Sequence, residues 1–252
     1  MPAPGHASTN GGVMIATTRL DEMRLEQEPN NFDTPYLRCG PGHTWKKIYD
    51  FLEPYNLIAV GGRVAGVGTG LILGGGNSFF SNTYGWAANN VVNFEVVLAD
   101  GRVVMANKNS NADLFWALKG GSNNFGIVTR YDIKVYTANL MWGGAVAWDS
   151  EYIEAFLNAQ TEFMLLGGGS GDPKAALMSN IEVDAVGVVT SGAMLVYQDA
   201  VVNPPAFAPF LHIPPMFSTL GVQKFAHLVA PTAAYGARDR RYVLRFSYKT
   251  FI

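Results

Sequence analysis

The chain of 252 residues is 48% hydrophobic and 15% charged, with 18 Lys and Arg residues against 20 Asp and Glu. This predicts a folded protein of one or two domains and excludes the charge pattern of a binder of nucleic acid or anionic membranes. The single cysteine, Cys39, excludes an internal disulfide and disfavours a structural zinc site. No apolar run reaches the ~20 residues of a membrane span, and the first residues lack a signal-peptide pattern.

The predicted elements begin with a short helix and a strand that lead into a glycine-rich loop. Four apolar residues at helical spacing predict the helix in HTWKKIYDFLEPY, with Thr44 as its cap and Pro54 as its stop. A buried strand is predicted in NLIAVGG, which starts at Asn56. The loop that follows reads GVGTGLILGGGNSFF, from Gly66 to Phe80, and six glycines fall within its first eleven residues.

A hairpin, a helix and a long strand are predicted after this loop. Asp100-Gly101 favours a two-residue turn between two β-rich runs. SNADLFWALKGG predicts a helix with Ser110 and Asp113 as a capping box and Gly120 just past its end. FGIVTRYDIKVY alternates, which predicts a half-buried strand. Its expected apolar face consists of Phe125, Ile127, Tyr131, Ile133 and Val135, and its polar face of Arg130, Asp132 and Lys134.

The character of the sequence changes near Thr137, where we predict a boundary between two domains, 1–137 and 138–252. The second part contains a strand in GGAVAW, a helix in SEYIEAFLNAQTEFML and a hairpin in AALMSNIEVDAVGVVTSGAMLVYQ. A proline-broken helical stretch, a helix near KFAHLVAPTAAYG and a strand in RRYVLRFSYKTF complete the prediction.

Two familiar glycine motifs do not fit the loop. A dinucleotide fingerprint needs a glycine at its sixth position, where counting from Gly66 and from Gly68 gives Leu71 and Leu73. A phosphate-binding P-loop needs Lys and then Ser or Thr after its last glycine, but Asn77 stands there. Two interpretations remain: a tight loop with close strand packing, or bare backbone that donates to a pyrophosphate or lies against a planar ring.

Several motifs occur in one order between Arg38 and Tyr136. GGRVAGVGTGLILGGGNSFFSNTYGWAANNVVNFEVVLADGRVV, followed by DLFWALKGGSNNFGIVTRYDIKVY, resembles the FAD-binding domain of the vanillyl-alcohol oxidase superfamily, in particular fungal enzymes akin to berberine bridge enzyme. The resemblance implies an α+β fold: a PCMH-type FAD-binding domain, incomplete at its N-terminus, followed by part of a substrate domain with an antiparallel sheet and helices. It also implies FAD as cofactor, a small-molecule substrate, and molecular oxygen as a candidate electron acceptor.

The resemblance assigns cofactor-binding residues to three segments. On the flavin side they are Gly66, Gly68, Gly70, Gly74, Gly75, Gly76, Asn77 and Ser78. The next segment adds Gly85, Asn89 and Asn90. On the adenine side they are Gly121, Asn124, Phe125, Gly126, Ile127 and Val128. For Phe125, Ile127 and Val128, core packing on a strand stays an equal interpretation. For Gly75 we expect a backbone that contacts the flavin.

The chain departs from the family at both positions of covalent flavin attachment. Gly62-Arg63 stands where doubly attached members carry a cysteine, and His6 lies downstream of the family's attachment histidine. We therefore expect non-covalent FAD, Cys39 in the core and His6 in a solvated loop. The family segments before Met1 and after Ile252, including one that often holds the catalytic base, have no match, so the chain is expected to be truncated at both ends.

Two hypotheses of function follow. The chain is either an FAD-dependent oxidoreductase that oxidises a small organic substrate by hydride transfer, with secondary metabolism as its setting, or a truncated, inactive remnant that binds FAD weakly or not at all. A third reading, carbohydrate or polyphenol binding by Trp142 and Trp148, competes with their use as core residues. Tyr197 is expected as a strand residue, so the catalytic residue is unknown, and no metal, nucleic acid or membrane is expected as a partner.

The remaining histidines have no recognisable partners in the sequence. His43 is expected near a helix N-terminus, and His212 and His227 are expected to be structural or exposed.

Overall fold

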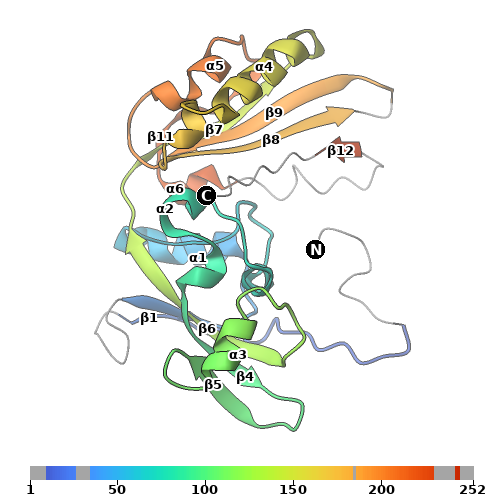
Figure 1. Cartoon of the computed structure of the whole chain (residues 1–252), viewed down its shortest axis with the longest axis vertical. Coiled ribbons are helices and arrows are strands. Elements are labelled where there is room, and N and C mark those ends of the chain that lie inside the picture. Colours follow the sequence, from blue (N-terminus) through green and yellow to red (C-terminus); the bar gives the residue numbers. More distant parts are fainter. Residues whose placement is uncertain (1–9, 27–34, 184–185, 230–241, 245–252) are drawn as a thin grey trace. The chain divides into compact units, whose positions relative to one another are not determined.

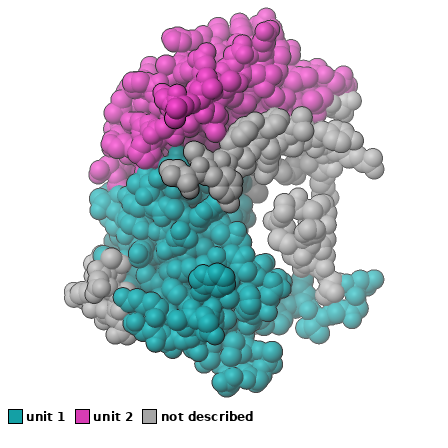
Figure 2. Space-filling model, viewed as in Figure 1, with its two compact units in different colours: residues 1–137 teal, residues 138–252 magenta. Residues whose placement is uncertain are grey.

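The chain divides at Thr137 into two units, each built around one antiparallel sheet (Figure 1). Unit 1 spans Met1–Thr137 and unit 2 spans Ala138–Ile252, as coloured in Figure 2. The computed structural model describes residues 10–26, 35–183, 186–229 and 242–244.

The sheet of unit 1 has the strand order β1-β2-β6-β4-β5, and β3 pairs with the C-terminal end of the long strand β6. The strands are β1 (Met23–Glu26), β2 (Tyr36–Cys39), β3 (Leu57–Ala59), β4 (Val91–Val97), β5 (Val103–Asn107) and β6 (Ile127–Thr137). The helices are α1 (Trp45–Leu52), α2 (Ser81–Tyr84) and α3 (Ala112–Ala117), with the 3-10 helices η1 (Glu53–Tyr55), η2 (Thr69–Gly74) and η3 (Ala87–Asn90). The site described below lies on η2, η3 and the start of β6.

Helix α1 confirms the predicted apolar face, although its cap differs from the prediction. The four buried residues of the helix are Trp45, Ile48, Tyr49 and Leu52. Thr44 is the N-cap residue, but its side chain accepts no cap hydrogen bond, and its backbone pairs instead with Gly68 of the glycine loop. Pro54 lies in the first turn of η1, where a backbone N–H would have no helical partner. The chain therefore continues from α1 into one 3-10 turn before the helical segment ends.

The hairpin of β4 and β5 forms as predicted, but its loop has three residues and not two. The N–H of Leu98 donates to the carbonyl of Arg102 at 2.9 Å, and the N–H of Gly101 donates to the carbonyl of Leu98 at 3.0 Å. Only Gly101 of the loop has a positive φ, +83°. This is a type I turn closed by a glycine bulge, which needs one left-handed residue, whereas a two-residue turn of type I′ would need two.

The predicted capping box of α3 is wrong. Asn111, with φ of +48°, is the N-cap residue, and its side chain makes no cap hydrogen bond. The Oδ1 of Asn107 accepts from the N–H groups of Asn109 and Ser110. These two bonds, and not a capping box, form the turn before the helix. After the helix, Gly120 has φ of +130°, a conformation that favours glycine.

The predicted alternation of β6 holds only beyond a β-bulge. Glu95 pairs with Arg130 but Val96 pairs with Val128, so Thr129 is an extra residue in β6. Residues before Thr129 therefore point to the opposite face of the sheet from the one that simple alternation predicts. Val128 is therefore buried, whereas Ile127, expected in the core, is 37% exposed. Phe125 is 40% exposed, which corrects its assignment to the apolar face as well.

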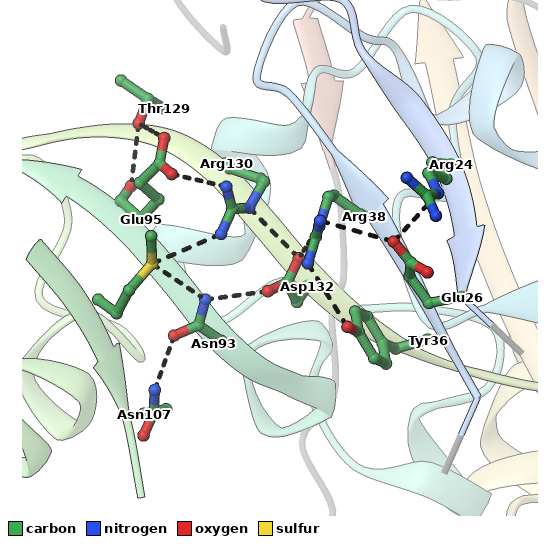
Figure 3. A network of polar contacts seen from close by, with 11 residues as sticks. Arg24, Glu26, Tyr36, Arg38, Asn93, Glu95, Asn107, Thr129, Arg130 and Asp132 are labelled. Atoms are coloured by element: carbon green, nitrogen blue, oxygen red, sulfur yellow. Dashed lines mark hydrogen bonds and ion pairs between the residues drawn. The ribbon is translucent and has the colours of Figure 1, made fainter. Parts of the chain in front are cut away.

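The polar face of the same sheet is also more buried than alternation predicts. Asp132 is 2% exposed, because a network of side chains covers it (Figure 3). Its carboxylate accepts from Arg38 Nε at 3.3 Å and from Asn93 Nδ2 at 2.9 Å, and Arg130 Nε lies 3.5 Å away. Glu95 pairs with the same Arg130 at 2.6 Å. A buried carboxylate is tolerated only with such partners, so these contacts stabilise the register of three strands, β2, β4 and β6.

Unit 2 has the strand order β10-β7-β9-β8-β12, with β11 also paired to β7. The strands are β7 (Met141–Trp148), β8 (Ala175–Val183), β9 (Val189–Tyr197), β10 (Phe217–Ser218), β11 (Gly221–Gln223) and β12 (Tyr242–Leu244). The helices are α4 (Ile153–Met164), α5 (Ala208–Leu211) and α6 (Phe225–Leu228), with the 3-10 helices η4 (Ser150–Tyr152), η5 (Gly169–Gly171) and η6 (Pro205–Phe207). The predicted strand, helix and hairpin of this part are confirmed in β7, α4 and β8-β9.

The core of unit 2 lies between one face of its sheet and helices α4 and α5 (Figure 1). Trp142 and Trp148 are buried there, which favours the core interpretation over carbohydrate or polyphenol binding. Phe163 and Phe207 stack with ring centroids 5.6 Å apart. The predicted helix around Lys224 is the short α6, and the predicted terminal strand is described only at β12; residues 230–241 and 245–252 lie outside the described ranges.

Candidate functional site: the glycine loop and its two neighbours

The loop at Gly66–Ser78 contains glycines that the fold requires. Gly75 and Gly76 follow η2, with φ of +93° and +78°. A Cβ at Gly76 would lie 2.8 Å from the Cβ of Ala87, so close packing excludes any side chain there. At Gly75 the ring of Trp86 would be 3.6 Å from an added Cβ, an ordinary contact, so only the backbone conformation requires glycine. This part of the loop agrees with the tight-loop interpretation.

Gly70 and Gly74 have no such requirement. Neither has a positive φ, and within the described ranges no atom beyond the chain neighbours and the backbone of η2 lies within 4 Å of a Cβ built at either position. Both are exposed. Gly68 is similar, with only the carbonyl of His43 at 3.7 Å, and Gly66 is exposed. The fold therefore leaves bare, accessible backbone along η2, which is the surface that a planar ring or a pyrophosphate needs.

Hydrogen-bond donors also remain on this loop. In the part of the chain that the structure describes, the N–H groups of Gly76 and Asn77 donate to no other atom. Because most buried backbone donors in proteins are paired, two successive donors at a glycine loop indicate a site for an acceptor such as a phosphate oxygen. These residues fit the pyrophosphate and flavin of FAD.

Three backbone hydrogen bonds join the loop to the two other predicted segments. Ala87 N–H donates to Gly76 O and Ala88 N–H to Gly75 O, both at 2.9 Å. Ser122 N–H donates to Leu73 O at 2.9 Å. The structure thus brings together three stretches, 66–78, 85–90 and 121–128, that are far apart in the sequence.

Several predicted ligands use their side chains inside the fold. Ser78 is buried, and its Oγ accepts from Gly61 N–H at 3.2 Å. Asn90 is 2% exposed, and both N–H donors of its amide are engaged within the fold. Asn124 donates to Gly121 O at 2.7 Å. For Ser78, Asn90 and the buried Val128, only the backbone stays available to a cofactor, whereas the side chain of Asn124 is exposed.

In the segments 85–90 and 121–128, the fold requires glycine either because of close packing or because of a positive φ. Gly126, with φ of +149°, packs against the backbone of Val97, since a Cβ there would lie 2.7 Å from that carbonyl oxygen. Gly121 packs under the ring of Phe125, which an added Cβ would approach to 2.4 Å. Gly85 has φ of +76° next to the exposed Asn89. The side chains that stay exposed for a ligand are Asn89, Asn124, Phe125 and Ile127.

Lys119, near the turn at Gly121–Val128, has no acidic partner among the described residues. Lys119 precedes Gly120 and lies over the ring of Phe115, with its Nζ 3.9 Å from the ring centroid. Burial lowers the pKa of Lys119, and the charge of Lys134 adds to this effect. No carboxylate among the described residues lies within ion-pair distance of its ammonium group.

Covalent attachment is disfavoured around Gly62 for a reason that the sequence does not reveal. A Cβ at Gly62 would lie 2.5 Å from Cδ1 of Trp45, whose indole fills the space of any side chain at this position. Cys39 is buried at the end of β2, which confirms its place in the core, and burial raises the pKa of its thiol. His6 lies outside the described residues.

The other titratable candidates have structural surroundings. His43 precedes α1, as expected, and its Nε2 lies 2.9 Å from the carbonyl oxygen of Asp21. His212 and His227 are exposed. Tyr197 ends β9, as expected, and its hydroxyl donates to Asp172 at 2.9 Å, a bond that raises the pKa of the tyrosine. The described ranges contain no cluster of three or more potential metal ligands. No helix in them has the length and apolarity to cross a bilayer.

Comparison with known proteins agrees with this geometry. Residues 2–107 match the family model of the FAD binding domain. The chain is 39% identical over 229 residues to the FAD-dependent monooxygenase prx3 of Penicillium roqueforti, a match that covers 89% of this chain and 43% of the relative. It is 36% identical over 250 residues to the bifunctional solanapyrone synthase of Alternaria solani, covering 99% of this chain and 45% of the relative. The chain therefore spans less than half the length of these relatives.

Solved structures share the fold. The chain superposes on 6-hydroxy-D-nicotine oxidase from Arthrobacter nicotinovorans with a TM-score of 0.77 and 21% identity, over 93% of this chain and 51% of that one. Berberine bridge enzyme gives a TM-score of 0.62 at 20% identity, over 77% and 40%. The two sheets with their helices are thus the α+β fold of PCMH-type flavoproteins. Residues 2–107 are similar to the FAD binding domain, and over most of its length the chain is similar to fungal FAD-dependent monooxygenases, which supports FAD as its cofactor.

Proposed function

We propose that the chain binds FAD non-covalently on its glycine loop, and that the protein it represents oxidises a small organic substrate by hydride transfer to the flavin. The observation that carries the proposal is the bare backbone at Gly70 and Gly74, for which the fold offers no other reason. Bound FAD supplies the electron acceptor for the oxidation of a C–H bond, with molecular oxygen as a candidate final acceptor.

The residues of this chain supply binding and orientation. The N–H groups of Gly76 and Asn77 would hold the pyrophosphate, and the exposed backbone of η2 would lie against the ring system. The turn at Gly121–Val128 would hold the adenine side through its backbone. A fungal secondary-metabolite setting is supported by relatives such as the solanapyrone synthase. No residue is assigned as the catalytic base.

Titration of the purified, flavin-free chain with FAD tests this proposal. We expect quenching of flavin fluorescence with a micromolar or lower Kd, and a melting temperature that rises with FAD concentration, since a ligand stabilises the state it binds. FMN, which lacks the adenylate half, should bind more weakly. A soluble, cooperatively folded chain whose melting temperature ignores added FAD would instead support the inactive-remnant hypothesis.

A further inference from the structure

The side chain of Asn90 is buried and has no free hydrogen-bond donor to offer a cofactor. Its Nδ2 donates to Tyr84 O at 3.0 Å and to Trp86 O at 2.8 Å, and its Oδ1 accepts from the hydroxyl of Tyr136 at 2.6 Å. An amide has two N–H donors, and both are engaged here. Because Asn90 is also 2% exposed, these three bonds define its role.

Tyr136, whose hydroxyl donates to Asn90, belongs to the sheet of unit 1. Tyr136 lies on β6, where its neighbour in the sheet is Ile58 of β3. Its ring stacks on Tyr84, with centroids 3.9 Å apart and an interplanar angle of 19°. The sheet therefore fixes the position of the donor, and the donor fixes the position of Asn90.

The segment that Asn90 holds is the one that supports the glycine loop. Ala87 and Ala88 donate to the carbonyls of Gly76 and Gly75, and the ring of Trp86 lies beside Gly75. Since Asn90 binds the carbonyl of Trp86, it fixes the turn directly before these two donors. A continuous series of contacts thus runs from the sheet through Asn90 to the loop.

We propose that Asn90 and Tyr136 are positioning residues for the cofactor, which hold the turn at 84–90 against Gly75 and Gly76, and that neither side chain contacts FAD. The inference rests on the proposed function in that FAD is taken as the ligand of the loop. According to this inference, Asn90 affects the affinity for FAD through the shape of the glycine loop and not through a bond with the cofactor.

Tyr136→Phe tests the inference, because it removes one hydroxyl and keeps the ring stack. Two quantities are measured: the Kd for FAD, and the hydrogen-exchange protection of the Ala87 and Ala88 amides in the flavin-free chain. We expect the Kd to rise about tenfold and the protection of these two amides to fall about fivefold or more, while amides between β2 and β6 stay unchanged. Tyr55→Phe, at a half-exposed tyrosine of η1, is the matched control and should change neither quantity.

Asn90→Ala is the second variant, and it should weaken FAD binding further if it folds. Unchanged protection at Ala87 and Ala88 in Tyr136→Phe would overturn the inference. So would reduced protection with an unchanged Kd, since the support would then not serve the cofactor. If the unmodified chain itself fails to bind FAD, the proposed function has failed and the cofactor role of Asn90 is refuted with it, whereas a wild-type Kd in Tyr136→Phe refutes the inference alone.

Discussion

Two glycines one position apart in the loop differ in why they lack a side chain. At Gly75 the positive φ demands glycine whatever the loop binds, so an alanine there would be strained with or without a cofactor. Gly74 has an ordinary φ and open space. A substitution at Gly74 is therefore the clean test of contact, and Gly75→Ala, the choice that the sequence suggests, is not.

We expect Gly74→Ala to weaken FAD binding about tenfold or more while changing the free energy of unfolding of the flavin-free chain by less than about 1 kcal/mol. Gly171→Ala is the matched control, because Gly171 also ends a 3-10 helix with an ordinary φ and open space. Fluorescence titration gives the Kd, and urea unfolding gives the stability. Equal FAD affinity in both variants would remove ligand contact as the reason for Gly74.

Cys39 provides a second residue-scale prediction. Burial raises the pKa of its thiol above that of the unfolded chain, so the unfolded state loses its proton first as the pH rises. The stability that this group contributes is thus present below about pH 8.5 and declines above it. A thiol reagent at pH 8 should label the native chain only at the rate of unfolding, and rapid stoichiometric labelling under native conditions would contradict the buried position.

At the scale of elements, sequence patterns succeed where local chemistry decides the structure. The spacing of Trp45 to Leu52 predicts α1, and Asp100-Gly101 predicts the hairpin. They fail where a partner elsewhere decides. The bulge at Thr129 depends on its pairing with β4, which the sequence of β6 does not contain, so Ile127 and Phe125 are misplaced. At α3 the failure is local, because Asn107 competes with Ser110 for the turn before the helix.

The candidate site shows the same limit. The glycines are visible in the sequence, but the reason for some of them depends on distant residues, such as Ala87 for Gly76 of the loop and Trp45 for Gly62 before it. Trp86 beside Gly75 and the Tyr84–Tyr136 stack have no signal in a single sequence beyond their aromatic character. Asn90 is predicted as a ligand because a motif match does not distinguish a side chain that binds from one that supports.

The hairpin loop yields a prediction at this scale. Gly101→Ala should destabilise unit 1 by about 1–2 kcal/mol, because an L-residue is strained at φ of +83°. Gly101→Asn should cost less, since asparagine tolerates this conformation better. Urea unfolding at constant m-value measures both variants. Equal stability of the alanine variant and the wild type would mean that the loop relaxes to another turn.

At the scale of the whole molecule, the two units have separate sheets, and the predicted cofactor residues all fall in unit 1. The relatives named above are more than twice as long as the aligned part of this chain. Binding of FAD and oxidation of a substrate are consequently separable questions, and a chain that binds the cofactor without turnover would still agree with the site described here.

The mode of attachment is testable on the whole chain. After loading with FAD and denaturation by acid, we expect all flavin in the supernatant and an unmodified polypeptide mass, because Trp45 occupies the space beside Gly62 and Cys39 is buried. Flavin retained by the denatured polypeptide, with a mass shift on the peptide that contains His6, would show that this histidine is the attachment residue.

The three ties between the segments of the site, from Ala87, Ala88 and Ser122, join main chain to main chain. No side-chain atom takes part in them, so exchanging a neighbouring exposed side chain leaves the frame intact. Asn89 and Ile127 can accordingly be randomised in a library without dismantling the scaffold, whereas Asn124 and Phe125 contact Gly121 and are kept. Variants from such a library would differ in their relative affinities for flavin analogues, while the backbone frame of the site stays the same.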